Sequence, residues 1–349
     1  MGSFPAFAPE QGDFFCKIPK VDLHRHLEGS LRVDTMLEVI REHNLDLPGL
    51  PELPARVQIQ PEDAHDSSIF LSKFQTLRLF YRSPEIIRRI TCEAIADAAA
   101  DNVRYLELRF SPVALSRAKG YPLADVMDWV CASAQQASQE YGVKTRLVAS
   151  INRHEPVALG EQIAGLAAAR MAQGITGLDL TGDEAHFPAA PFLDVFTQAQ
   201  RGGLAITIHA GEWGGPENVR QAIEVFNADR IGHGLRVLED EDVVALAAAR
   251  GIPFEICITS NYQSGVTPTL NGHGVQRMLA AGLNVTLNTD DPSVSQITLG
   301  NEYRLACASL GVPFETLFER ILAAARAAFL PDIERQQLAA QLNQQLAAL

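Results

Sequence analysis

The chain has 349 residues, of which 47% are hydrophobic and 20% charged, a composition typical of a soluble globular protein with a large core. Its formal net charge of −13 comes without a basic cluster, so a nucleic-acid backbone would be repelled, and we expect no DNA or RNA partner. The five cysteines are widely spaced without a C-x-x-C motif, as is typical of free thiols. With neither a signal-like start nor an apolar run long enough to span a membrane, the sequence predicts a cytoplasmic protein that does not bind membranes.

Eight short runs rich in apolar and β-branched residues recur along the chain, each followed by a stretch compatible with a helix. The runs span about residues 20–27, 103–110, 143–151, 175–181, 204–209, 229–233, 252–258 and 283–290. Strands that alternate with helices are typical of parallel sheets, and eight repeats predict a (β/α)8 TIM barrel, formed as a single domain over residues 1–349. An open, doubly wound sheet is the weaker alternative because the sequence contains no G-x-G-x-x-G turn.

The gap between the first two predicted strands is too long for one crossover helix and predicts a helical insertion at about residues 33–101. Helices are expected there near 33–43, 67–81 and 84–101. An insertion after a barrel strand lies on the catalytic face, so we expect a lid whose inner side carries Phe70, Phe74 and Phe80. Each of these rings could instead pack the core of the insertion. Extra C-terminal helices are predicted near 299–310, 313–328 and 332–348.

Histidines and carboxylates lie at the carboxyl ends of the predicted strands, which form one face of a barrel. They are His24 and His26 on the first strand, His209 on the fifth, His233 on the sixth, and Asp290 and Asp291 on the eighth. On an extended strand His24 and His26 point to the same side and can hold one ion between them. A donor set of His24, His26, His209 and Asp290 contains no cysteine, which favours a catalytic metal site with one divalent ion, expected to be Zn²⁺.

Two more residues are predicted to handle protons. Glu212 follows His209 by three residues, where the strand turns towards a helix, so its carboxyl can lie beside the metal without binding it. His233 could orient and deprotonate the attacking water or stabilise the charge that develops as it adds. The alternatives are a helix-start carboxylate for Glu212 and a fourth metal ligand for His233. Asp290 and Asp291 face opposite ways unless the backbone turns, as the following proline suggests, and then one can bind metal and the other substrate.

Six segments occur in the order VDLHRHLEGSLR, LDLTGDE, ITIHAGE, RIGHG, CITSN and LNTDDP, and together they resemble the signatures of the adenosine deaminase family over nearly the whole chain. The resemblance implies a zinc-dependent aminohydrolase that converts a 6-aminopurine to its 6-oxo form and releases ammonia, with a zinc-bound hydroxide attacking C6. The family's zinc ligands match His24, His26, His209 and Asp290. Glu212 matches the residue that protonates ring N1, and His233 the residue that orients the attacking hydroxide and helps to activate it.

The substrate contacts are also implied by the resemblance. Asp291 matches the position that contacts N7, Gly182 matches the backbone group near N3, and His26 is expected beside the substrate as well as the metal. Glu28 matches the position associated with the sugar 5′-hydroxyl, where the well-known adenosine enzymes carry aspartate in H-L-D-G.

The choice of substrate depends on that difference. A longer side chain at the position of Glu28 occurs in relatives that act on adenine or on 5′-modified adenosines, whereas FLSKFQTLRLF resembles the lid helix of the nucleoside branch. We therefore expect adenosine and 2′-deoxyadenosine first, 5′-modified adenosines such as aminodeoxyfutalosine next, and free adenine third.

Two other classes of function could use the same fold and metal site. Barrel hydrolases with one metal ion also open lactones and cyclic amides, and a metal-stabilised binding protein without activity could keep the same fold. Glu212 and Asp291 favour a purine substrate over the first class. The complete set of ligands, proton shuttle and substrate positions favours an enzyme over the second.

Overall fold

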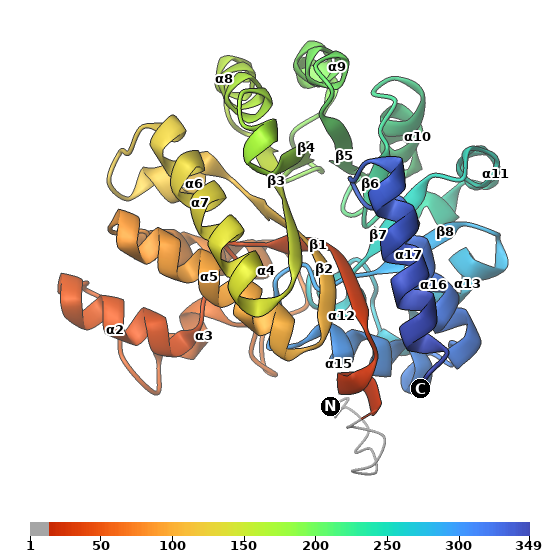
Figure 1. Cartoon of the computed structure of the whole chain (residues 1–349), viewed down its shortest axis with the longest axis horizontal. Coiled ribbons are helices and arrows are strands. Elements are labelled where there is room, and N and C mark those ends of the chain that lie inside the picture. Colours follow the sequence, from red (N-terminus) through yellow and green to blue (C-terminus); the bar gives the residue numbers. More distant parts are fainter. Residues whose placement is uncertain (1–13) are drawn as a thin grey trace.

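The computed structural model describes residues 14–349, so the first 13 residues of the predicted domain lie outside the described residues. Eight parallel strands form one sheet in the order β1 to β8 (Figure 1). They are β1 (Lys20–His26), β2 (Val103–Phe110), β3 (Lys144–Asn152), β4 (Ile175–Thr181), β5 (Ala205–His209), β6 (Arg230–Gly232), β7 (Pro253–Ile256) and β8 (Asn284–Leu287). An isolated parallel bridge between Arg25 and Asp290 joins the chain beyond β8 to β1, and the predicted (β/α)8 barrel is confirmed.

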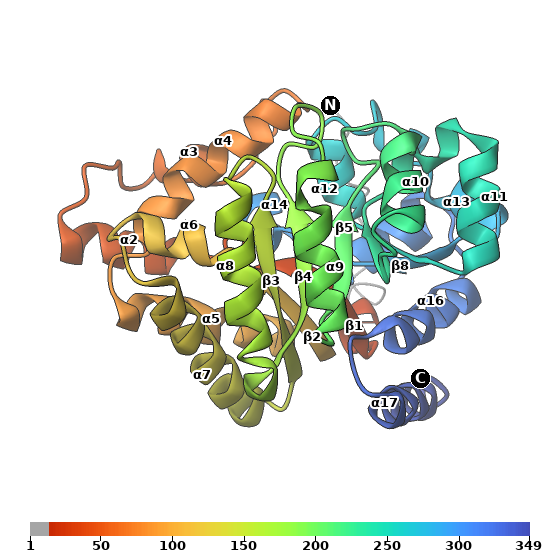
Figure 2. The ribbon, with the colours of Figure 1, turned by 90° about the horizontal axis from the view of Figure 1, so that it is seen from above.

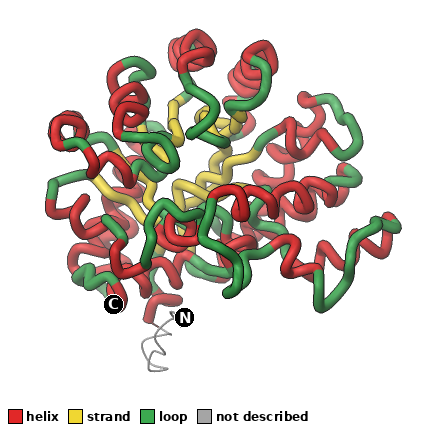
Figure 3. Tube along the Cα trace, turned by 180° about the vertical axis from the view of Figure 1, so that it is seen from behind, coloured by secondary structure: helices red, strands yellow, loops and turns green. Residues whose placement is uncertain are grey.

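Helices surround the strands, as the ring of red tube around the yellow centre in Figure 3 shows. Every residue of β6 is buried, and β2 has a single exposed residue, Arg104, near its start. Burial on both faces is expected for parallel strands covered by helices, and it explains why these strands read in the sequence as nearly continuous apolar runs.

The predicted strands match the structure closely in the first half of the barrel and are too long in the second half. The eighth run was expected to continue to residue 290, but β8 ends at Leu287, and the seventh was expected to reach residue 258, but β7 ends at Ile256. A helix begins at Ile258, and Asp290 has a φ angle of +63°, which is incompatible with a strand. The residues after the short strands are therefore turned out of the sheet.

Figure 1 shows the helices α7 to α11 on the outside of the barrel. The helices that follow strands β2 to β7 are α6 (Pro112–Arg117), α7 (Leu123–Tyr141), α8 (Val157–Ala168), α9 (Leu193–Arg201), α10 (Pro216–Glu224), α11 (Glu241–Arg250), α12 (Ile258–Gln263) and α13 (Val275–Ala280). Beyond β8 the chain forms α14 (Pro292–Ser295), α15 (Leu299–Arg304) with a π-helical turn (Leu305–Ser309), α16 (Phe314–Ala327) and α17 (Asp332–Leu346), so the predicted C-terminal helices are confirmed. Short 3₁₀ turns occur at Met171–Gln173, Ala190–Phe192, Leu235–Glu239 and Leu270–Gly272.

Between β1 and β2 the chain forms the predicted helical insertion. It contains α2 (Val33–His43), α3 (Leu53–Val57), α4 (Ser67–Leu77) with a 3₁₀ turn (Arg78–Phe80), and α5 (Pro84–Ala100). The Asp66 carboxylate accepts the backbone N–H of Ser68 at 2.8 Å and so caps the start of α4. Figure 2 shows α3 and α4 at the end of the molecule towards which the arrows of β3 and β4 point.

A buried lysine ties α4 to the segment before it. The Lys73 ammonium donates to Asp63 Oδ2 at 2.6 Å and to the carbonyl oxygen of Ala55 at 2.9 Å. Because a buried ammonium is stable only with such partners, α4 is held in place over the barrel end. No helix within residues 14–349 is long and apolar enough to span a lipid bilayer.

Candidate metal and catalytic site

A cavity of about 270 Å³ opens at the carboxyl ends of the strands, beneath α4. All predicted site residues except His24 line it: His26, Glu28, Gly182, His209, Glu212, His233, Asp290 and Asp291. Phe70 and Phe74 line it as expected, whereas Phe80 is fully buried and is not among the lining residues. The lid prediction was thus wrong for Phe80, which packs in the core of the insertion.

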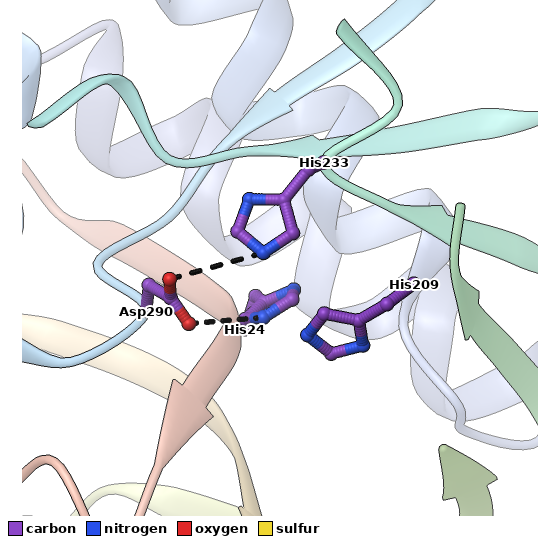
Figure 4. Close-up of side chains that lie close together, drawn as sticks. All are labelled: His24, His209, His233 and Asp290. Atoms are coloured by element: carbon purple, nitrogen blue, oxygen red, sulfur yellow. Dashed lines mark ion pairs between the residues drawn. The ribbon is translucent and has the colours of Figure 1, made fainter. Parts of the chain in front are cut away.

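Histidine and aspartate side chains converge at the floor of the cavity. Asp290 Oδ1 lies 3.2 Å from His24 Nε2 and 3.4 Å from His26 Nε2. Ligand atoms of His24, His209, His233 and Asp290 all lie within 4.8 Å of one another, and Figure 4 shows these four side chains pointing towards a common centre. The geometry therefore brings together all four predicted metal ligands and also places His233 within reach of an ion.

Buried carboxylates hold two of these imidazoles from behind. His24 Nδ1 lies 2.8 Å from Glu255 Oε2, and His209 Nδ1 lies 2.8 Å from Asp179 Oδ1. A histidine that binds a metal through one nitrogen usually donates the other N–H to a carboxylate, which fixes the ring and its tautomer. His24 Nε2 is buried and, within the described part of the chain, has no hydrogen-bond partner, as expected of a nitrogen that serves a metal ion.

One guanidinium joins the two carboxylates. Arg109 lies in the barrel interior, 3.1 Å from Asp179 Oδ2 and 2.9 Å from Glu255 Oε2, and its side chain is fully buried. It balances the negative charge of both carboxylates. The orientation of His24 and of His209 thus depends on the same cation.

Asp290 is placed by a backbone turn. Its N–H donates to the His24 carbonyl at 2.7 Å, and its Oδ2 accepts a hydrogen bond from the Ser260 hydroxyl at 2.6 Å. Burial opposes ionisation, but the neighbouring imidazoles of His233 and His24 outweigh it and hold the pKa of Asp290 well below its usual range. For Asp291, burial and the adjacent Asp290 hold the pKa well above its usual range. The pKa values of the two adjacent carboxyls are thus shifted in opposite directions.

Glu212 lies in the cavity and not on a helix. The helix α10 begins at Pro216, so the alternative of a helix-start carboxylate is wrong. Glu212 Oε1 lies 3.7 Å from His233 Nε2. Burial, with the charge of Asp290, holds the pKa of Glu212 well above its usual range, which favours the protonated form of this carboxyl.

The architecture and the site agree with comparisons of the chain with known proteins. A family model described as adenosine deaminase matches residues 19–345. The adenosine deaminase of Klebsiella pneumoniae (strain 342) is 37% identical over 324 residues, which cover 92% of this chain and 96% of that protein. The chain belongs to the adenosine deaminase family.

Solved structures of the family's wider group have the same fold. A zinc-bound amidohydrolase from Burkholderia ambifaria is 25% identical, with a TM-score of 0.89 over 99% of this chain and 96% of that one. The adenine deaminase of Arthrobacter aurescens is also 25% identical, with a TM-score of 0.87 over 95% of this chain and 99% of that one. The resemblance inferred from the six sequence segments is therefore confirmed.

The side of the cavity assigned to the substrate by the family resemblance contains Glu28. Its Oε1 accepts the backbone N–H of Ser111 at 2.6 Å, while its buried Oε2 has no hydrogen-bond partner among residues 14–349. Burial raises the pKa of Glu28 to about 7. Gly182 has a φ angle of +101°, a conformation that favours glycine. A Cβ atom at Gly29 would lie 1.8 Å from Asp291 Oδ1, so that position also needs glycine.

Glu184 is a site residue that sequence reasoning missed. Its carboxylate accepts the backbone N–H groups of four consecutive residues, Gly211 to Gly214, at 2.7–3.1 Å, and the Asn218 side-chain amide at 2.8 Å. It therefore fixes the loop that carries Glu212. The signal was present in LDLTGDE, because an acidic side chain directly after a buried strand needs partners.

Asp179 and Glu255 were missed in the same way. Each is a carboxylate inside an otherwise apolar strand, in LDL of β4 and FEI of β7, and each is fully buried. A buried carboxylate must be paired, so these positions pointed to partners in the barrel interior. The lining residues Arg78 and Trp213 carried no comparable signal, since each follows a helix or a turn whose path the sequence does not define.

Proposed function

We propose that the protein hydrolyses the 6-amino group of adenosine and 2′-deoxyadenosine, giving inosine or 2′-deoxyinosine and ammonia. The observation that carries this proposal is the placement of the buried Glu212 carboxyl, whose pKa is raised, in the cavity at which His24, His209 and Asp290 converge. A proton donor beside a metal-binding centre is what addition of water to an aromatic amidine requires. The name of the Klebsiella relative supports the choice of adenosine.

We assign the metal ion to His24, His26, His209 and Asp290. The donor set of three imidazoles and one carboxylate suits Zn²⁺, and the zinc-bound Burkholderia structure supports that choice. When bound, such an ion lowers the pKa of a water molecule so that it can attack at neutral pH. Burial holds the pKa of His26 well below its usual range, so its imidazole is neutral and able to bind the ion.

The side chains around the purine then have separate tasks. Glu212 gives its proton to ring N1, which makes C6 electrophilic. The resulting carboxylate then accepts the proton of the hydroxyl group that has added to C6 and passes it to the amino group, which leaves as ammonia. Asp291 is assigned to N7, and its raised pKa favours the protonated form, which can donate a hydrogen bond to that acceptor nitrogen. The backbone N–H of Gly182 is assigned to N3, and His233 faces the oxygen that adds to C6. Together these contacts hold the ring with C6 over the donors.

A second candidate is a 5′-modified adenosine, such as aminodeoxyfutalosine. It is favoured by Glu28, whose Oε2 is buried without a hydrogen-bond partner, and by Arg78, a lining residue whose Nε likewise has none within the described residues. Unsatisfied polar atoms at one end of a cavity are suited to a polar substituent of the substrate. Free adenine ranks third, because it would leave that end empty.

The substrate is a small molecule in each case, and we propose that the protein acts in the cytoplasm. The cavity volume of about 270 Å³ and the net charge of −13 support a small purine over a nucleic acid. All five cysteines are free, which fits a reducing compartment.

The test is a spectrophotometric assay of the zinc-loaded protein with a panel of adenine derivatives. Deamination changes the ultraviolet absorbance of adenine, and kcat/KM should be highest for adenosine and 2′-deoxyadenosine. A higher value for aminodeoxyfutalosine would replace the first candidate by the second. If no adenine derivative is converted, the proposed function is wrong. Elemental analysis of the purified protein should find one divalent ion per chain.

A further inference from the structure

The nitrogen of His233 that faces away from the cavity contacts a buried asparagine, which in turn contacts a buried histidine, and neither takes part in the proposed chemistry. His233 Nδ1 lies 3.1 Å from Asn261 Nδ2. On its other side, Asn261 Oδ1 lies 3.3 Å from His273 Nε2. Asn261 is fully buried and His273 nearly so, so water does not compete for these hydrogen bonds.

The backbone N–H of Val275 determines which group donates and which accepts in the hydrogen bonds that join His273, Asn261 and His233. The N–H of Val275 donates to His273 Nδ1 at 3.1 Å, so that nitrogen carries no hydrogen. Burial, with the charge of Arg277, lowers the pKa of His273 to about 4, so the ring is neutral at physiological pH and its one proton is on Nε2. His273 Nε2–H therefore donates to Asn261 Oδ1, and the NH₂ group of Asn261 is turned towards His233.

The amide then determines the tautomer of His233. An NH₂ group can only donate, so His233 Nδ1 must accept and the proton of the neutral ring lies on Nε2. We propose that Asn261 and His273 are positioning residues that fix His233 as its Nε2–H tautomer, which makes it a hydrogen-bond donor to the cavity. On this assignment His233 is neither a base nor a metal ligand. Its part in deamination rests on the proposed function, but the tautomer does not.

The Nε2–H tautomer decides among the roles that the sequence left open for His233, which are a base, a metal ligand and a group that orients the attacking oxygen or stabilises its charge. Nε2 lies 3.7 Å from Glu212 Oε1 and 3.8 Å from Asp290 Oδ2, so its N–H is directed to the region where the attacking oxygen must be. A nitrogen that already carries a proton cannot take another or bind a cation. His233 would then orient the oxygen and stabilise the negative charge that forms on it, while Glu212 alone moves protons. His26 is left as the remaining metal ligand.

The tautomer can be measured directly on the zinc-loaded protein without substrate. Nitrogen-15 labelling of the histidines and long-range ¹⁵N–¹H correlation spectra distinguish a protonated from an unprotonated ring nitrogen, and loss of one set of signals in His233→Gln identifies His233. We expect an unprotonated Nδ1 and a protonated Nε2. A proton on Nδ1, alone or together with one on Nε2, would overturn the proposal. Neither result depends on whether adenosine is the substrate.

Variants of the two positioning residues add a functional readout. Asn261→Asp replaces the NH₂ group by an acceptor of the same shape, so the proton of His233 should move to Nδ1. We expect kcat to fall by roughly 10–100-fold with KM nearly unchanged, which is typical when a residue behind a catalytic group is altered. An unchanged tautomer in this variant would contradict the proposal.

A matched pair at His273 tests the donor that orients the amide. His273→Gln keeps an N–H that can donate to Asn261 Oδ1, whereas His273→Leu removes it and frees the amide to rotate. We expect the spectrum and kcat of His273→Gln to resemble those of the unaltered protein, and His273→Leu to show both tautomers and a lower kcat. Equal behaviour of the two variants, both folded by circular dichroism, would show that His273 does not orient Asn261.

Discussion

The first four strands of the barrel and the last four build it in different ways. The strands β1 to β4 contain 7 to 9 residues each, whereas β5 to β8 contain 3 to 5. Where the short strands end, the backbone leaves the sheet, and His233 and Asp290 have positive φ angles of +57° and +63°. Such conformations are costly for residues other than glycine and are concentrated at functional sites. The long strands thus form the regular part of the sheet. The short strands are followed by site residues, such as His233 and Asp290, with positive φ angles.

In the half of the barrel formed by β5 to β8, side-chain hydrogen bonds hold the groups that lie beyond the strand ends. Glu184 holds the backbone after β5, and Ser260 holds the Asp290 carboxylate after β8. After β7, the buried Glu302 carboxylate accepts the backbone N–H of Thr259 at 3.2 Å and also its hydroxyl. Removal of these groups should therefore damage the site without unfolding the long strands.

The largest effect is expected for Asp290→Ala. Loss of this carboxylate from the donor set should release the metal ion and lower kcat/KM by roughly 10³-fold or more, because the several kcal/mol that a metal contributes are lost. Elemental analysis and steady-state kinetics measure both effects. Asp291→Asn is the control and should keep the ion. Full metal content in Asp290→Ala would show that another residue completes the site.

Glu212→Gln should separate proton transfer from metal binding. The amide cannot give a proton to N1, so kcat should fall by about 10²–10⁴-fold, while metal content stays that of the unaltered protein. If the ion is lost together with the activity, Glu212 is a ligand and its assignment as a proton donor is wrong.

Glu184→Gln tests whether the loop after β5 is held by this carboxylate. The NH₂ group of glutamine would face backbone N–H groups, so the loop with Glu212 should shift and kcat should fall by roughly 10–100-fold. Asn218→Ala removes only one of the donors to Glu184 and should cost much less. Equal kinetics for Glu184→Gln and the unaltered protein would refute the positioning role.

Glu302→Gln should alter the pH dependence of stability. Burial raises the pKa of Glu302 from 4.5 to about 7, so the folded state keeps this proton after the unfolded chain has lost it. The unaltered protein should therefore lose about 3 kcal/mol of stability from this group as the pH rises through that window, with the full contribution present below it. Urea unfolding at about pH 5 and about pH 8 should show that loss in the unaltered protein and not in the variant. A similar pH dependence of both proteins would contradict the expectation.

The long-strand half was also the half that the sequence described well. The runs 103–110 and 175–181 coincide with β2 and β4, because buried parallel strands leave a continuous apolar pattern. In LNTDDP the following proline suggests a turn, but the sequence does not show that the strand already ends at Leu287, before Asp290. The chemistry of the site could still be predicted, because several histidines that share a placement at strand ends would rarely arise by packing alone. Their orientation depends on Glu184, Asn261 and His273, which are distant in sequence and become neighbours only in the fold.

Arg109 has a further consequence for the choice of ion. Because its guanidinium binds both carboxylates that hold His24 and His209, neither imidazole can swing outward without disturbing the other. Proteins discriminate among transition metals mainly through the shape that the donors impose. An ion that prefers square-planar coordination would require the imidazoles of His24 and His209 to move apart. The packed barrel interior would resist that movement. We therefore expect the choice of ion at the mouth of the barrel to depend on the buried charge of Arg109 below it.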